Sequence, residues 1–181
     1  HVPFQAGSNR VLRRMGRGYT RESYLELVDA LRSAAQHLTL STDVIVGFPG
    51  ETEEDFQSTL DLIRHVRFGQ LYGFIFSPRK GTAAARLTEQ VPHAEAGDRL
   101  NRLFAAQGGI QLDLNRRLVG RQVEVLVEGP AKRGTGQWHG RGADNRVINF
   151  PAWPGIREGE LALVDVTGAT AHSLLGCRAS E

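Results

Sequence analysis

Polar and glycine-containing segments follow three apolar stretches in the first two-thirds of the chain. The first, Gln5-Ala6-Gly7-Ser8, offers an amide, a hydroxyl and a turn that a ligand can approach. The second runs from Asp43 to Glu51 and includes a glycine-rich turn. The third, Phe76-Ser77-Pro78-Arg79-Lys80-Gly81-Thr82, places two cations after an apolar run. Because the carboxyl ends of the strands build the site of a parallel α/β barrel, these segments are candidates for ligand binding.

Each segment also has a purely structural interpretation. Gly47-Phe48-Pro49-Gly50 can be a simple strand-to-helix turn, and Asp43 can be a buried acid that accepts backbone hydrogen bonds. The chain contains no GxSxG elbow, HExxH pair or Walker motif, and its six histidines lack metal-ligand spacing. We therefore predict neither a catalytic residue nor a metal site within these 181 residues.

Basic residues gather in two parts of an otherwise balanced chain. The formal net charge is only +2, and 40% of the residues are hydrophobic, which suits one medium domain or a partial domain with a small one. Residues 10–21 contain five arginines and no acid. Lys132, Arg133, Arg141 and Arg146 form a second group. Both groups can bind a polyanion, although composition alone favours two solvated faces.

The single cysteine limits the chemistry of the chain. Cys177 cannot form an intramolecular disulfide, which is compatible with a reducing compartment, and it cannot hold an iron–sulfur cluster, which needs several thiolates. We expect it to be a small residue in or beside a terminal strand. No apolar run is long enough to cross a bilayer. We therefore predict a cytoplasmic protein without a membrane partner.

Apolar spacing predicts alternating strands and helices over residues 1–119. Expected strands lie at 2–5, within 38–48 and at 71–76. Thr20 and Thr52 are expected N-caps of the first two helices, and the third begins near Ala94. A kink or break is expected at Gly108-Gly109, because each glycine costs about 1 kcal/mol inside a helix. The order implies parallel pairing with right-handed crossovers, as in the trailing part of an eight-stranded barrel.

The pattern changes near Gly120. Residues 122–127, 138–150 and 160–167 are strand candidates separated by glycine and proline turns. Short strands without helices indicate a small antiparallel barrel. The predicted fold is therefore α/β: part of a parallel (β/α) barrel in residues 1–119, followed by a small antiparallel β-barrel in residues 120–181.

Five ordered segments resemble motifs of the radical-SAM methylthiotransferases and span nearly the whole chain. The most specific is STDVIVGFPGET. The segments are His1–Ser8, Arg14–Glu22, Ser41–Thr52, Phe76–Thr82 and Gly140–Phe150. The resemblance implies that the first domain is the C-terminal portion of a radical-SAM barrel and that the second is a TRAM domain, an OB-like barrel. Within the family, SPRxGT and NRxVxF look more like the MiaB-type tRNA branch.

The resemblance also implies cofactors. Members use S-adenosylmethionine and two 4Fe-4S clusters, whose cysteine ligands would lie in an N-terminal part of the same polypeptide. The segment Val44-Ile45-Val46-Gly47 would pack its backbone and an apolar side chain on the adenine, while Gln5 and Ser8 would face the ribose or the substrate. The residues implied to line this pocket are Gln5, Ser8, Asp43, Val44, Ile45 and Gly47. Ala6, Lys80 and Ala83 depart from the family pattern, which leaves the fine substrate assignment open.

The TRAM-like segment is expected to bind the anticodon stem-loop of tRNA. Cations would contact phosphates and Trp138 would stack on a base, although Trp138 can equally be a core residue. The implied RNA-binding residues are Lys132, Arg133, Trp138, Arg141, Asn145 and Arg146. The implied activity is addition of a methylthio group to isopentenyl-adenosine beside the anticodon. Alternatives are another branch, acting on threonylcarbamoyl-adenosine or a ribosomal protein, and a module that only binds RNA.

Overall fold

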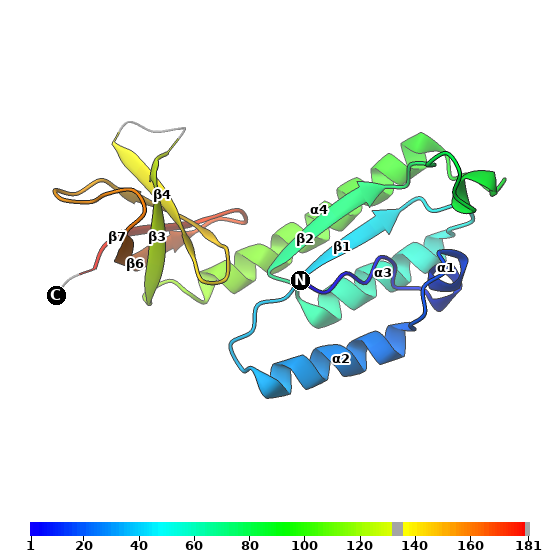
Figure 1. The fold of residues 1–181 in the computed structure, drawn as a ribbon, viewed down its shortest axis with the longest axis horizontal. Coiled ribbons are helices and arrows are strands. Elements are labelled where there is room, and N and C mark those ends of the chain that lie inside the picture. Colours follow the sequence, from blue (N-terminus) through cyan, green and yellow to red (C-terminus); the bar gives the residue numbers. More distant parts are fainter. Residues whose placement is uncertain (132–135, 180–181) are drawn as a thin grey trace. The chain divides into compact units, whose positions relative to one another are not determined.

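The chain divides into two compact units. The computed structural model describes residues 1–131 and 136–179, and the units comprise residues 1–110 and 111–181 (Figure 1). The division falls inside helix α4 (His93–Arg116). Gly120, where we predicted the domain boundary, lies between α4 and the next strand, β3 (Gln122–Pro130). The predicted residues Lys132 and Arg133 lie outside the described residues.

The first unit is built on parallel strands. Strand β1 (Ser41–Val46) pairs with β2 (Gln70–Ile75) in parallel. The N-terminal segment runs beside β1 as a third extended chain, with Gln5 N donating to the Asp43 carbonyl at 3.0 Å and Ile45 N donating to the Gln5 carbonyl at 2.9 Å. The predicted parallel arrangement is confirmed, although the first strand is reduced to an isolated bridge.

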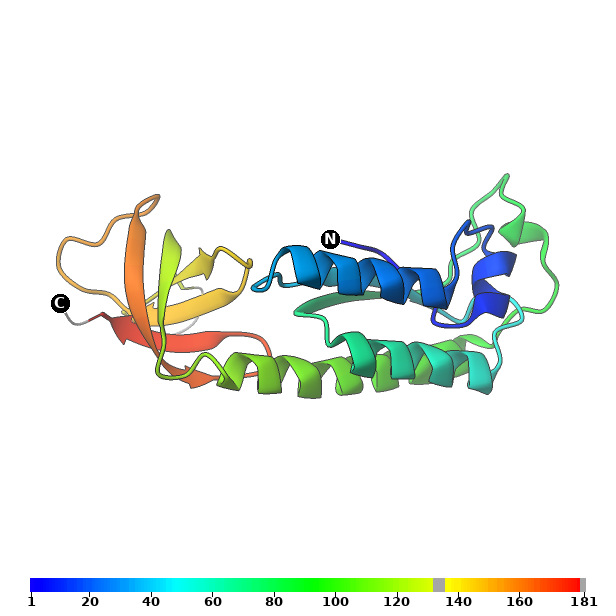
Figure 2. The same ribbon diagram turned by 90° about the horizontal axis from the view of Figure 1, so that it is seen from below.

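Helices connect these strands in the expected alternation. They are α1 (Asn9–Arg14), α2 (Arg21–Ala34), α3 (Glu53–Val66), the 3-10 turn η1 (Ala84–Arg86) and α4. Thr20 and Thr52 each form a capping box, with Ser23 and Asp55 respectively, which confirms both predicted caps. Figures 1 and 2 show α3 and α4 running together along one side of the strands, with α2 beyond the N-terminal segment.

One face of the sheet is covered and the other is open. Strand β1 alternates, so that Thr42, Val44 and Val46 are fully buried on the helical side. On the opposite side, Tyr72 and Phe74 of β2 are 46% and 53% exposed. Because these large aromatic side chains are about half exposed, no other part of the unit covers this face of the parallel strands among the described residues.

Helix α4 continues through Gly108-Gly109, so the predicted kink was wrong. Packing on both sides of the glycine pair explains the difference. The Gln107 amide donates to the Phe68 carbonyl at 2.8 Å, and Leu103 and Ile110 are buried. These tertiary contacts outweigh a propensity loss of about 1 kcal/mol per glycine.

The second unit is a closed five-stranded barrel in the order β3-β4-β5-β7-β6. The remaining strands are β4 (Gln137–Gly142), β5 (Val147–Pro151), β6 (Leu161–Ala169) and β7 (Leu174–Arg178). The predicted strand at 138–150 is in fact two strands, and β7 holds Cys177 in a terminal strand as expected. All pairs are antiparallel except β5 with β7, which is parallel.

A continuous apolar core fills this barrel. Inward side chains from every strand except β4 form it, and Trp138 of β4 packs against it from a half-buried position. The fully buried members are Val125, Val127, Ile148, Phe150, Val164, Val166 and Leu174. Gly140 allows β3 and β4 to approach closely, because a Cβ there would lie 2.3 Å from the Leu126 carbonyl oxygen. None of the described helices combines the length and apolar character needed to cross a membrane.

Candidate functional site

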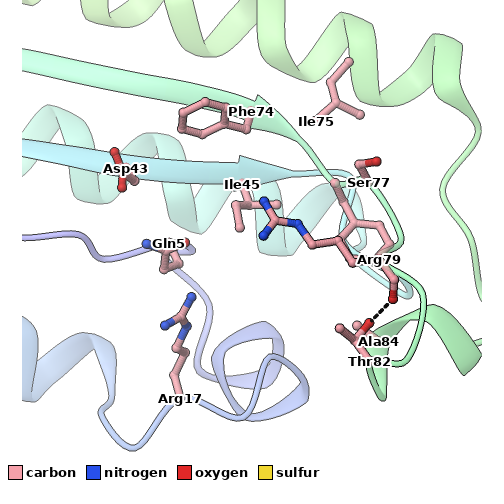
Figure 3. Close-up of a pocket in the computed structure, with 11 residues that line it drawn as sticks. Gln5, Arg17, Asp43, Ile45, Phe74, Ile75, Ser77, Arg79, Thr82 and Ala84 are labelled. Carbon is pink, nitrogen blue, oxygen red and sulfur yellow. Dashed lines mark hydrogen bonds between the residues drawn. The ribbon is translucent and has the colours of Figure 1, made fainter.

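A cleft of about 550 Å³ opens on the uncovered face of the parallel strands (Figure 3). Its walls come from the N-terminal segment, β1, β2 and the loops that follow them. The volume lies within the range of about 300–1,000 Å³ that small-molecule pockets usually have. Its position at the carboxyl ends of parallel strands is the expected place for a ligand site.

Three of the six residues predicted for the cofactor pocket line this cleft: Gln5, Asp43 and Ile45 (Figure 3). Gln5 is buried and has a left-handed backbone, with φ at 69°. Both its N–H and its carbonyl form hydrogen bonds with β1, and these bonds hold the strained backbone in place. The Asp43 carboxylate lies 3.5 Å from the His1 imidazole. The cleft therefore combines an amide, a carboxylate and an apolar side chain.

The other three predicted residues do not line the cleft. Val44 is fully buried on the helical side, because successive side chains of a strand point to opposite faces. The Ser8 hydroxyl donates to the Asp55 carboxylate at 2.5 Å. Gly47 has φ at 70°, and its N–H donates to the Glu51 carboxylate at 2.6 Å. These residues support the cleft from behind instead of facing it.

A buried ion pair anchors the turn at the end of β1. The Arg99 and Glu51 side chains are only 2% and 1% exposed, and Arg99 Nη1 lies 2.8 Å from Glu51 Oε2. Burial raises the pKa of the Glu51 carboxyl, although the hydrogen bonds from the Gly47 N–H and from Arg99 act in the opposite direction. Our sequence reasoning missed Arg99, since an arginine in an amphipathic helix is usually solvent-exposed.

A second acid ties the N-terminal segment to α3. Burial raises the pKa of Asp55, but hydrogen bonds from Arg10, Ser8 and Thr52 outweigh it, so that this pKa lies well below its usual range. Arg10 also donates to the Gly50 carbonyl at 2.5 Å. The sequence indicates Asp55 as the capping-box partner of Thr52, but it gives no sign that Ser8 and Arg10 also bind Asp55.

The predicted RNA-binding residues of the barrel meet on β4 and the turn that follows it. Arg141 donates to the Glu128 carboxylate at 3.1 Å and to the Asn145 side chain at 3.1 Å. Its side chain remains 40% exposed. The Arg146 side chain is only 15% exposed and pairs with Asp144. Arg141 is therefore open to a ligand, while Arg146 mainly fixes the turn.

Comparison with known proteins covers both units. Residues 1–63 match the Radical SAM superfamily, and residues 116–177 match the TRAM domain. Over 97% of its length the chain is 50% identical to the tRNA-2-methylthio-N(6)-dimethylallyladenosine synthase of Moorella thermoacetica. The proteins of the same name from Pelotomaculum thermopropionicum and Mycobacterium avium are 45% and 46% identical, each over 97% of the chain. The chain belongs to the radical-SAM methylthiotransferase family.

The chain spans 39% of the length of the first two of these relatives and 25% of the third. The radical-SAM match lies within the first unit, and the TRAM match coincides with the closed five-stranded barrel. Among residues 1–131 and 136–179, no group of three or more histidine, cysteine, aspartate or glutamate side chains is placed to hold a metal ion.

Proposed function

We propose that this chain is the part of a tRNA methylthiotransferase that lines the cofactor cleft and binds RNA. The whole protein would add a methylthio group to N(6)-dimethylallyladenosine beside the anticodon by radical S-adenosylmethionine chemistry. The observation that carries the proposal is the identity of 45–50%, spread over both units, to proteins whose name states this activity.

The cleft residues fit S-adenosylmethionine. Ile45 offers an apolar side chain for the adenine, and Gln5 and Asp43 offer polar groups for the ribose or the amino-acid portion. When bound there, S-adenosylmethionine would supply the radical chemistry. Ser8, Val44 and Gly47 would act indirectly, because their contacts hold β1 and its following turn in position.

The two 4Fe-4S clusters would be held by cysteines elsewhere in the polypeptide. A cluster of this kind needs several thiolates, and the chain has one cysteine, the exposed Cys177. The 181 residues alone should therefore not cleave S-adenosylmethionine under reducing conditions. We further propose that the protein acts in the cytoplasm, where its tRNA substrate is found.

The TRAM barrel would bind the anticodon stem-loop. Arg141 offers guanidinium donors on the surface of the barrel beside Asn145, and Arg146 would hold the turn that carries Asn145. Trp138 packs partly on the barrel core, which leaves only part of its ring for stacking on a base. Lys132 and Arg133 remain candidates for phosphate contacts on sequence grounds.

Nucleoside mass spectrometry of tRNA tests the proposed reaction. Deleting the full-length gene should remove the methylthio group from the hypermodified adenosine and leave N(6)-dimethylallyladenosine. The wild-type gene should restore the modification, and so should a Tyr72→Phe variant, because this residue shares the open face without lining the cleft. An Asp43→Ala variant should not restore it.

The same measurement separates the alternatives. Loss of the methylthio group from threonylcarbamoyl-adenosine would place the protein in another branch of the family. An unchanged nucleoside profile would exclude both tRNA reactions and leave the ribosomal-protein branch and the RNA-binding module, which mass spectrometry of the ribosomal proteins would separate.

A further inference from the structure

The structure divides the basic segment at residues 10–21 into anchored and free arginines. Three of the five are held by protein partners: Arg10 by Asp55, Arg14 by Glu89, and Arg21 by the Ser58 carbonyl. Arg17 is exposed and lines the cleft. The anchored arginines therefore build the unit. Of the other two, Arg13 is exposed outside the cleft lining, which leaves Arg17 available for a ligand in the cleft.

Arg79 lies in a different loop and lines the same cleft as Arg17. Figure 3 shows both guanidinium groups directed into the space beside Gln5 and Ile45. Neither group has a hydrogen-bond or ion-pair partner in the part of the chain that the structure describes. Asp43 is the single acidic side chain among the described residues that line the cleft, and it lies beside His1. Two unpaired cations at one opening create a site of positive potential.

The floor between these cations is apolar. Phe74 is 53% exposed on this face, and Ile45 lies beside it. Aromatic side chains next to arginines are the usual elements of sites for single-stranded nucleic acid, because a base stacks on the ring and the phosphate meets the cation. The combination therefore suits an unpaired nucleotide together with its phosphate.

We propose that Arg17 and Arg79 form a subsite for a phosphodiester group of the RNA strand, next to the nucleotide that enters the cleft. This inference rests on the proposed function and adds to it a second RNA contact, distinct from the TRAM barrel. The two guanidinium groups, on separate exposed loops, can bind the two free oxygens of a phosphodiester. A small carboxylate could accept the same bonds, but it carries no base to stack on the exposed Phe74, so a nucleotide phosphodiester is the better match.

Binding of a synthetic anticodon stem-loop RNA at several salt concentrations tests the subsite. Arg17→Ala combined with Arg79→Ala should weaken binding by about tenfold or more and flatten the logarithmic salt slope by about 0.7 for one lost phosphate. Arg13→Ala combined with Arg64→Ala removes the same charge from exposed positions outside the cleft lining, and it should leave most of the slope intact. Circular dichroism should show that both double variants remain folded.

A scan with methylphosphonate linkages locates the contact. Each loop phosphate is replaced in turn by this neutral group. At one position the replacement should weaken binding to the wild-type protein but not to the Arg17→Ala, Arg79→Ala variant, because the RNA change and the protein change remove the same interaction. No wild-type binding at all would overturn both the subsite and the proposed RNA recognition. Wild-type binding with an unchanged slope in the variant would overturn the subsite alone. Loss of S-adenosylmethionine binding with an unchanged RNA slope would assign the arginines to the cofactor carboxylate instead.

Discussion

Replacing Arg99 by methionine tests the role of the buried ion pair behind the cleft. The Arg99 guanidinium donates to the Glu51 carboxylate at 2.8 Å, to the Glu51 carbonyl at 3.1 Å, and to Glu95. Methionine fills a similar space without the charge. The Glu51 carboxylate would then remain buried with the Gly47 N–H as its principal donor.

The expected loss is large, because a buried charge would be left without its counter-ion. Removing one partner of a buried pair costs about 3–5 kcal/mol, a substantial part of a typical folding free energy of about 5–15 kcal/mol. Arg102 on the same helix provides the matched control. It pairs with Glu53, but its side chain is 37% exposed, so Arg102→Met should cost only about 0.2–1 kcal/mol.

The loss should also depend on pH. Burial raises the pKa of Glu51, so the folded state binds the proton more tightly than the unfolded state. Stability contributed by Glu51 therefore falls as the pH rises from the ordinary glutamate pKa through the raised folded value. Without Arg99 this pKa rises further. The Arg99→Met penalty should be greatest at neutral pH and should shrink in mild acid.

Urea unfolding followed by far-ultraviolet circular dichroism measures the effect, because α1, α2 and α3 lie in the first unit. Trp138 and Trp153 both lie in the second unit, so their fluorescence serves as an internal reference. Adding Glu51→Gln should recover most of the loss, since no buried charge then remains at that position. This reasoning would be refuted if Arg99→Met lowered the free energy of unfolding at neutral pH no more than Arg102→Met does, or if its effect did not change with pH.

Three further variants test other parts of the structure. Asp55→Asn should lower the free energy of unfolding by about 2 kcal/mol at neutral pH. Because the folded pKa of Asp55 is depressed, the stability difference from wild type should narrow as acid protonates the wild-type carboxylate, which urea unfolding at several pH values measures. Gly109→Ala should raise the melting temperature by gaining up to about 1 kcal/mol, because nothing lies within 4 Å of the added Cβ; a lower melting temperature would argue against the straight helix. Arg141→Ala should flatten the salt dependence of RNA binding, whereas Arg146→Ala should mainly lower thermal stability, and equal effects of both variants on the slope would contradict this division.

Local signals in the sequence were sufficient to predict much of the scaffold. Thr20 and Thr52 are followed by partners three residues later, and a capping box depends only on residues within one turn of the helix. The buried run ending at Val46 and the following glycine-rich turn likewise indicate a strand that enters a helix. Such features depend on short-range chemistry, which explains why they were predictable.

Features that depend on distant contacts could not be predicted in the same way. Gly108-Gly109 weakens a helix locally, but packing of Leu103 and Ile110 keeps α4 continuous. Motif position alone placed both Val44 and Ile45 at the cofactor, although adjacent side chains of a strand face opposite ways and only Ile45 lines the cleft. The alternation rule excludes one of the two, but the face that stays open is set by tertiary structure.

The contacts on the two sides of the cleft suggest how rigidity is distributed around the ligand site. The turn that follows β1 is closed locally by the Gly47 N–H, which donates to the Glu51 carboxylate. Two long-range bonds also hold it: the Gly50 N–H donates to the Glu89 carbonyl at 2.6 Å, and Arg14 donates to the Pro49 carbonyl at 3.1 Å. In the loop that carries Arg79, the described side-chain hydrogen bonds of Thr82 stay within that loop and η1. A segment whose side-chain hydrogen bonds are local opens at lower free energy than one tied to a buried ion pair. A fixed wall at β1 would keep Ile45 and Asp43 in one geometry for the cofactor, while a more adaptable rim at Arg79 would let an RNA strand enter and leave.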